Sequence, residues 1–263
     1  MNERLRSVLR AVVVYGLPPA IAFAVVIGAW EAYITWRDIS ILVVPAPSDI
    51  WERFADDPGY FWEQGWWTFY EATLGLIFGS AIAIALAVIM AHSRPVERGL
   101  LPLAIAMKVT PLVAIGPVLI VIFGFGTTPK IFLAALLCFF PMLVNALTGF
   151  RDVDPGALEF MCSLRASRWS IFWKLRSPSS LPYVLSALRI TYPLALVGAV
   201  IAEWFTGNRG LGYVVYSAAQ NLRTPELFSA IAVLALIGVA INIGLSLLER
   251  RVLFWHESVR STQ

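Results

Sequence analysis

Charged residues are scarce in this chain. They make up 14% of the 263 residues, whereas soluble domains carry about 25%. Hydrophobic residues make up 59%, so the composition excludes an ordinary soluble protein and indicates an integral membrane protein. The formal net charge is only +3, which argues against nucleic acid as a partner.

Groups used in catalysis are also rare, with two histidines and two cysteines in the whole chain. The sequence contains no GxxxxGK[ST] phosphate loop, so we expect no ATP binding of that kind. No His, Cys and carboxylate residues have metal-site spacing, and nothing places Ser, His and Asp as a triad. Cys138 lies in an apolar run and Cys162 in a charged segment, so packing is a better explanation than a disulfide. We therefore expect no enzyme activity, no metal and no cofactor in this chain.

Long apolar runs are what the sequence has in abundance. A membrane-spanning helix needs about 20 mainly apolar residues. Six stretches qualify: about Ala11–Trp36, Trp66–Met90, Leu100–Phe123, Ile131–Phe150, Tyr183–Phe205 and Leu227–Leu248. The second is rich in Gly, Ala and Ser, which predicts close helix packing, and the prolines of the third predict a kinked helix that lines a cavity. The sequence thus predicts an all-α integral membrane protein with about six spans, forming one domain over residues 1–263.

Arginine and lysine residues are distributed unevenly between the two sides that six spans would create. One side carries Arg4, Arg6, Arg10, Arg94, Arg98, Arg151, Arg165, Arg168, Lys174, Arg176, Arg250, Arg251 and Arg260. The other side carries Arg37, Arg53, Lys130, Arg209 and Arg223. Because the side richer in these cations is usually cytoplasmic, we expect both termini and the 151–182 segment to lie inside the cell.

The segment Arg151–Pro182 is the only long amphipathic stretch between apolar runs. Asp154 before a proline predicts the N-cap of a first short helix, and Ser167 predicts that of a second. Pro178 and Pro182 are expected to end the second helix, because proline has no N–H to donate. Two interpretations stay open from composition alone: an interfacial helix resting in the headgroups, or a docking element for a soluble partner.

The spacing within this segment resembles the cytoplasmic EAA loop of ABC-importer permeases, in which a Glu-Ala-Ala group is followed by a glycine and an Ile-x-Leu-Pro group. Glu159 matches the glutamate, Phe160 and Met161 replace the alanines, Arg165 stands where glycine is usual, and Ser177 replaces the leucine. In that family the loop docks on the nucleotide-binding subunit. The resemblance implies that the docking residues here are Glu159, Ser163, Leu164, Arg165, Ala166, Ser167, Arg168 and Trp169. Glycine would ease a corner with positive φ, so Arg165 implies either a corner built differently or a less typical docking site.

Further motifs follow the order found in permeases of the nitrate/sulfonate/taurine type, which the chain resembles over nearly its whole length. They are VVPAPSDIWERF, PLVAIGPVLIVIFGFGTTPKI, FFPMLVNALTGFRDVDP and AEWFTGNRGLGYVV. The resemblance implies an inner-membrane permease subunit of an ATP-driven importer. It also implies a second permease subunit, identical or different, cytoplasmic subunits that hold ATP and Mg²⁺, and an extracytoplasmic solute-binding protein. The solute it implies is a small organic molecule, such as a vitamin or pyrimidine precursor, riboflavin, or a sulfonate or similar anion.

Three polar side chains in the predicted spans are candidates for lining the pathway. Lys108 could meet an anionic or carbonyl-bearing solute, or it could extend to the cytoplasmic headgroups. Asn145 is more typical of a hydrogen bond between helices than of a ligand contact. Glu203 is expected to pair with Arg209 or a backbone donor, with a gating element beside Gly210 as the sharper alternative.

Two other functions remain to be weighed against a permease. An ion-coupled carrier would use buried carboxylates as its coupling site, and we expect the inner spans to hold almost none. A membrane scaffold would need only an amphipathic loop resting on the bilayer.

Overall fold

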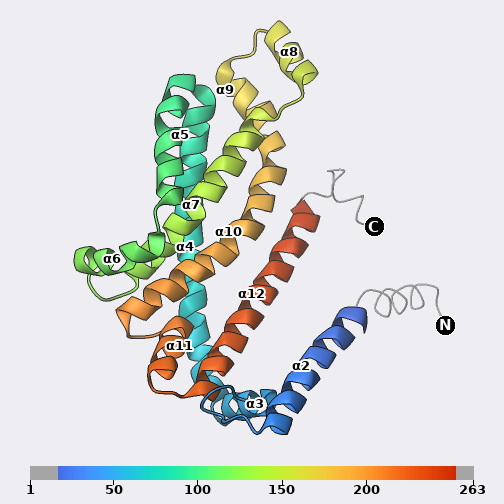
Figure 1. The fold of residues 1–263 in the computed structure, drawn as a ribbon. Coiled ribbons are helices and arrows are strands. Elements are labelled where there is room, and N and C mark those ends of the chain that lie inside the picture. Colours follow the sequence, from blue (N-terminus) through green and yellow to red (C-terminus); the bar gives the residue numbers. More distant parts are fainter. Residues whose placement is uncertain (1–16, 253–263) are drawn as a thin grey trace, which may run out of the picture. The chain divides into compact units, whose positions relative to one another are not determined.

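The computed structural model describes residues 17–252, and these residues are helical with short connections (Figure 1). In chain order the elements are α2 (Leu17–Arg37), α3 (Pro47–Asp56), α4 (Pro58–His92), α5 (Arg94–Val109), η2 (Leu112–Ile115), α6 (Gly116–Phe123), α7 (Thr128–Arg151), α8 (Pro155–Ser163), α9 (Arg168–Ile171), η3 (Phe172–Arg176), α10 (Ser177–Thr206), α11 (Leu211–Gln220) and α12 (Thr224–Val252). The described chain divides into two compact units, one from 17–61 with 215–231 and the other from 62–214 with 232–252. A single domain over 1–263 stays a prediction.

Five described helices are long and apolar enough to span a membrane: α2, α4, α7, α12 and the continuous run from α9 through α10. They overlap five of the six predicted spans, and the all-α membrane fold is confirmed. The predicted start of the first span and the basic residues Arg4, Arg6 and Arg10 lie outside the described residues. The cytoplasmic placement of the two termini therefore stays a prediction.

The predicted third span differs most from expectation. Instead of one kinked helix, α5 is followed by η2 and α6 with a bend of 85° between the two parts. Pro111 lies in the break, where it has no N–H to continue the hydrogen-bond ladder of α5. Pro102, by contrast, is accommodated inside α5. Together the two parts form a sixth candidate span, broken at its middle.

Helix α7 packs along much of its length against α10 (Figure 1). Small residues allow the backbones to approach. A Cβ atom on Gly198 of α10 would lie 2.7 Å from Ala134 Cα, and one on Gly79 of α4 would lie 2.5 Å from Ala135 O. Such distances are too short for a side chain, so glycine is required at both positions. This confirms the close packing predicted for the second span.

The smaller unit is connected by polar contacts between its own segments. The Glu31 carboxylate of α2 accepts hydrogen bonds from Ser48 N (3.0 Å) and Ser48 Oγ (2.8 Å) at the start of α3. Asp49 caps that helix by accepting from Ala46 N at 2.8 Å. Within the same unit, Glu226 of α12 faces Arg53 at 3.8 Å. These contacts fix the short helix α3 between two long ones.

The helix after Ser167 does not end where the sequence analysis predicted. Phe172–Arg176 forms a π-helical segment that leads directly into α10, with Ser177 N donating to Phe172 O. Pro178 lies in the first turn of α10 and Pro182 lies within it, so the prediction that they terminate the helix is wrong. The π-helical register ahead of Pro178 changes the hydrogen-bond pattern where the proline has no N–H to donate, so the helix continues past it.

Candidate functional site

The segment between α7 and α10 folds as two short capped helices, as predicted. The Asp154 side chain accepts a hydrogen bond from Ala157 N at 2.7 Å and begins α8, with Pro155 at its first position. The Ser167 hydroxyl accepts from Ser170 N at 3.1 Å and begins α9. Both N-caps satisfy backbone donors that a helix leaves unpaired. The segment is therefore built locally by its own sequence.

Arg165 forms the corner between the two helices. It follows the C-cap residue Leu164 and adopts a φ of 53°. Arg165 N donates to Cys162 O at 2.9 Å, and Ala166 N donates to Met161 O at 3.1 Å. This pair of bonds is a Schellman motif, whose left-handed position usually holds glycine. The corner therefore has the left-handed conformation that glycine usually adopts, and it is not built differently. For arginine this conformation costs about 1–2 kcal/mol of conformational energy.

The second short helix is anchored to the spans by aromatic side chains. Phe172 is buried and packs with ring centroids 5.3 Å from Phe150 of α7 and 5.1 Å from His92 at the end of α4. Trp169 stacks on the outer side of Phe172 at 5.6 Å. Movement of this segment would therefore be transmitted to the ends of α4 and α7.

An apolar surface remains exposed on the same segment. Phe160 is 65% exposed, Leu164 64%, Trp169 59% and Trp173 57%. Of the eight predicted docking residues, Ala166 is half-buried and the other seven are exposed: Glu159, Ser163, Leu164, Arg165, Ser167, Arg168 and Trp169. The structure thus brings them together on one two-helix segment. Large exposed aromatic side chains with interspersed charge are typical of an interaction surface.

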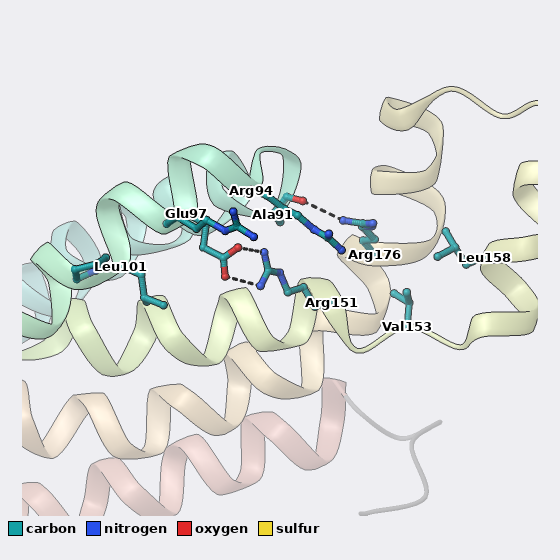
Figure 2. A pocket seen from close by; sticks show the side chains of 10 residues that line it. Ala91, Arg94, Glu97, Leu101, Arg151, Val153, Leu158 and Arg176 are labelled. Atoms are coloured by element: carbon teal, nitrogen blue, oxygen red, sulfur yellow. Dashed lines mark hydrogen bonds and ion pairs between the residues drawn. The ribbon is translucent and has the colours of Figure 1, made fainter.

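Two contacts fasten this end of the larger unit beneath the two-helix segment (Figure 2). Arg151, the last residue of α7, forms a bidentate ion pair with Glu97 of α5, in which both of its terminal nitrogens donate to the carboxylate oxygens. Arg176 of η3 donates to Ala91 O of α4 at 3.2 Å. The sequence analysis did not pair these residues, because they lie more than 50 positions apart.

Lys108 lies near the bend that follows α5. Its side chain is exposed, and Nζ stands 5.1 Å from the centroid of the Phe140 ring of α7. It borders a cavity of about 210 Å³ whose other lining residues are apolar: Met107, Leu112, Leu136, Leu137, Phe139, Phe140, Pro141 and Leu194. This distance is typical of a cation–π contact between the two side chains. The geometry is compatible with a pathway role for Lys108.

Asn145 and Glu203 do not join Lys108 in that cavity. Asn145 is half-buried, and its Nδ2 donates to Pro141 O at 2.8 Å within α7. The expected hydrogen bond between helices is thus replaced by one within its own helix. The three predicted pathway residues are therefore not gathered at one site.

Glu203 is fully buried and organises the turn before α11. Its carboxylate accepts from Thr68 Oγ1 at 2.8 Å and from Gly212 N at 2.6 Å, while Thr68 Oγ1 accepts from Leu211 N at 2.8 Å. A Cβ atom on Gly210, whose φ is 103°, would overlap the Glu203 carboxylate. The expected backbone donor is confirmed, and it explains the Gly-Leu-Gly sequence at this turn.

A buried ion pair that the sequence analysis missed lies between α4 and α7. Lys130 Nζ stands 3.1 Å from Glu71 Oε1, and both side chains are fully buried. Lys130 Nζ also donates to Arg209 O at 3.0 Å. The statement that the inner spans hold almost no carboxylate is wrong, because Glu71 and Glu203 are both buried within them. Lys130 lies in the first turn of α7, and its predicted side of the membrane stays a prediction. Glu71 within an apolar run was the available signal, because a carboxylate at such a position normally needs a partner.

The family described as "Binding-protein-dependent transport system inner membrane component" matches residues 75–253. The riboflavin transport system permease protein RibX of Chloroflexus aurantiacus is 32% identical over 245 residues, covering 92% of this chain and 91% of RibX. The formylaminopyrimidine transport permease protein ThiX of Halalkalibacterium halodurans is 31% identical over 247 residues, covering 92% and 96%.

A similar fold occurs in a solved structure of the MetNI methionine ABC transporter in an inward-facing conformation. The TM-score is 0.64 at 18% identity, and the match covers 71% of this chain and 93% of that chain. At this identity the likeness concerns the fold alone. The sequence matches, however, extend over two thirds of the chain and more. The chain therefore belongs to the family of binding-protein-dependent transport inner-membrane components, the permease subunits of ABC transporters.

Proposed function

We propose that this permease docks on a cytoplasmic ATP-binding subunit through the segment 151–182 and forms half of the pathway of an importer. The observation that carries the proposal is the exposed aromatic surface on two capped helices anchored to the span ends by Phe172. A rigid element of this kind can pass motion of a bound motor to the spans. An interfacial helix would instead direct its apolar side chains toward lipid and would not need this anchoring.

The complete transporter would contain a second permease subunit, ATP-binding subunits and an extracytoplasmic solute-binding protein. ATP and Mg²⁺ would be held by the partner subunits, and this chain would supply neither catalytic residues nor a metal site. Closure of the ATP-binding subunits would move α8 and α9. Contacts from Phe172 to α4 and α7 would carry this movement into the spans.

The proposed cargo is a small organic solute of the vitamin or pyrimidine-precursor type, with sulfonates and similar anions as the other candidates. Two relatives named for riboflavin and for formylaminopyrimidine support the first choice. Lys108 and the aromatic ring of Phe140 border a cavity of about 210 Å³, which is smaller than a typical small-molecule site and would hold only part of such a solute. Asn145 and Glu203 stay predicted pathway residues, although their contacts favour structural roles.

An ion-coupled carrier deserves comparison because two buried carboxylates, Glu71 and Glu203, lie within the spans. A coupling site must release its ion to water on each side. Here, however, Glu71 forms an ion pair with Lys130, and the Glu203 carboxylate accepts hydrogen bonds from Thr68 Oγ1 and Gly212 N. Both side chains are fully buried. These contacts favour a structural role over ion coupling.

Uptake into proteoliposomes separates these functions. The vesicles would contain the permease with its ATP-binding subunits, and labelled formylaminopyrimidine or riboflavin would be supplied with the solute-binding protein. We expect uptake only when ATP is present on the side of the ATP-binding subunits, and no loss when ionophores dissipate the ion gradients. Uptake that needs an ion gradient and proceeds without ATP would contradict the proposal.

A further inference from the structure

A basic cavity of about 660 Å³ lies at the end of the larger unit, next to the docking segment (Figure 2). It is formed where α4 ends, α5 begins, α7 ends and η3 passes into α10. Its lining residues are Ala91, Arg94, Glu97, Arg98, Leu101, Pro102, Arg151, Val153, Leu158 and Arg176. None of the roles assigned above uses this space.

The charges around the cavity are unbalanced. Four arginines and one glutamate line it, so the lining carries 4 − 1 = +3 charges. Arg151 is engaged by Glu97, and Arg176 is held by Ala91 O. Arg94 and Arg98, in contrast, form no ion pair with any described residue. The two unpaired guanidinium groups lie on the first turns of α5, whose N-cap residue Ser93 supplies no side-chain cap.

This arrangement is suited to a phosphate group. Arginine presents a planar set of donors that binds phosphate oxygens in pairs, and the start of α5 adds the positive end of a helix dipole. Arginines contributed by α5, α7 and η3 converge on one space (Figure 2). Because Glu97 is the only acidic residue of the described lining and is paired with Arg151, the remaining positive charge favours an anion from outside the chain.

We propose that the cavity binds the phosphate headgroup of an anionic phospholipid. The cavity lies at the ends of apolar spans, at the depth where a bilayer presents its headgroups, and basic pockets between spans at this level attract anionic lipid. Leu101 and Pro102 supply an apolar part of the lining, and the exposed Ile105, one turn beyond Leu101, extends this apolar surface along α5. Free phosphate would gain only the polar contacts, whereas a lipid gains both.

A bound lipid would also touch the docking segment, because Val153 and Leu158 line the same cavity. The lipid would hold the start of α8 against the ends of α5 and α7. Lipid binding itself does not depend on the proposed transport function, since it rests on the arginines and the span ends.

The test compares two charge-neutralised variants of the full chain purified in detergent with its ATP-binding subunit. Arg94→Gln/Arg98→Gln removes the two unpaired charges of the cavity. Arg250→Gln/Arg251→Gln removes two exposed charges from the last turn of α12 and serves as the matched control. Binding of phosphatidylglycerol, phosphatidylcholine and inorganic phosphate is measured by native mass spectrometry and by the shift in melting temperature.

We expect phosphatidylglycerol to bind and raise the melting temperature of the wild type and the control, and to bind at least about tenfold more weakly to Arg94→Gln/Arg98→Gln. Phosphatidylcholine and millimolar phosphate are expected to have no such effect. Equal phosphatidylglycerol affinity in the two variants would overturn the proposal. Displacement of the bound lipid by free phosphate would also overturn the proposal. So would a result in which Arg94→Gln/Arg98→Gln loses the ATP-binding subunit but keeps the lipid.

If the double variant fails to fold, Arg98→Gln alone decides the question. It is exposed and unpaired among the described residues, so its substitution leaves the packing intact. A reduction in phosphatidylglycerol affinity relative to Arg251→Gln supports the proposal, and equal affinity overturns it.

Discussion

Replacing Lys130 by methionine is expected to destabilise the helix bundle by about 3–5 kcal/mol, because Glu71 then keeps a buried charge without a partner. Both side chains are fully buried in the native protein, with Nζ and Oε1 3.1 Å apart. The change also removes the hydrogen bond to Arg209 O. Denaturation with sodium dodecyl sulfate in mixed micelles, followed by circular dichroism, would measure the loss.

A double variant makes this prediction specific to the ion pair. Lys130→Met/Glu71→Met removes both charges and is expected to recover most of the lost free energy of unfolding, since apolar replacement of a buried pair is often neutral. Lys108→Met is the matched control, because this lysine is exposed over Phe140 and its loss should cost no more than about 1 kcal/mol. Additive losses for Lys130 and Glu71 would show that the pair has no coupling.

The second large effect is expected at the docking surface. Glu159 is exposed on α8, and its replacement by lysine should reduce co-purification of the ATP-binding subunit at least about tenfold. The variant loses one attractive contact and gains charge repulsion at the interface, which together cost more than about 1.4 kcal/mol of binding free energy. The substitution lies on the surface of α8, so membrane insertion and helix content should be unchanged. Co-purification from solubilised membranes would give the ratio directly.

The matched control for this experiment is Glu52→Lys, which reverses an exposed carboxylate of α3 in the other compact unit. The charge distribution predicts that this residue lies on the opposite side of the membrane, so co-purification should not change. Equal co-purification of wild type and Glu159→Lys would count against docking through 151–182. Deleting Ser163–Trp173 is a less specific test, because it removes the buried anchors Ile171 and Phe172.

Local sequence signals predicted the local structure well. Asp154 and Ser167 cap α8 and α9 as expected, because each N-cap depends only on residues three positions away. The apolar runs predicted where long helices form. Hydropathy could not predict the 85° bend after α5 or the π-helical segment before Pro178. Both features depend on the backbone hydrogen-bond pattern around a proline and on packing against neighbouring helices.

Long-range polar contacts were harder to predict. Glu71 and Lys130 are 59 positions apart. Lys130 directly precedes an apolar run, where an unpaired lysine in a loop is as typical as a buried one. Likewise, Glu203 was correctly expected to meet a backbone donor, but its partner Thr68 lies 135 positions away. A single sequence indicates that a buried charged side chain needs a partner, but it does not indicate which residue that partner is. The two-helix form of the 151–182 segment was predictable because its signals are contiguous in the sequence, whereas its docking role stays a prediction.

The central claim is that the segment 151–182 is where the ATP-binding subunit holds this permease. A photo-crosslinking amino acid at Leu164, whose side chain is 64% exposed beside the Arg165 corner, tests it in intact membranes. The account predicts an adduct with the mass of the permease plus the ATP-binding subunit. Adducts with lipid alone, while the assembled transporter is present, would contradict it.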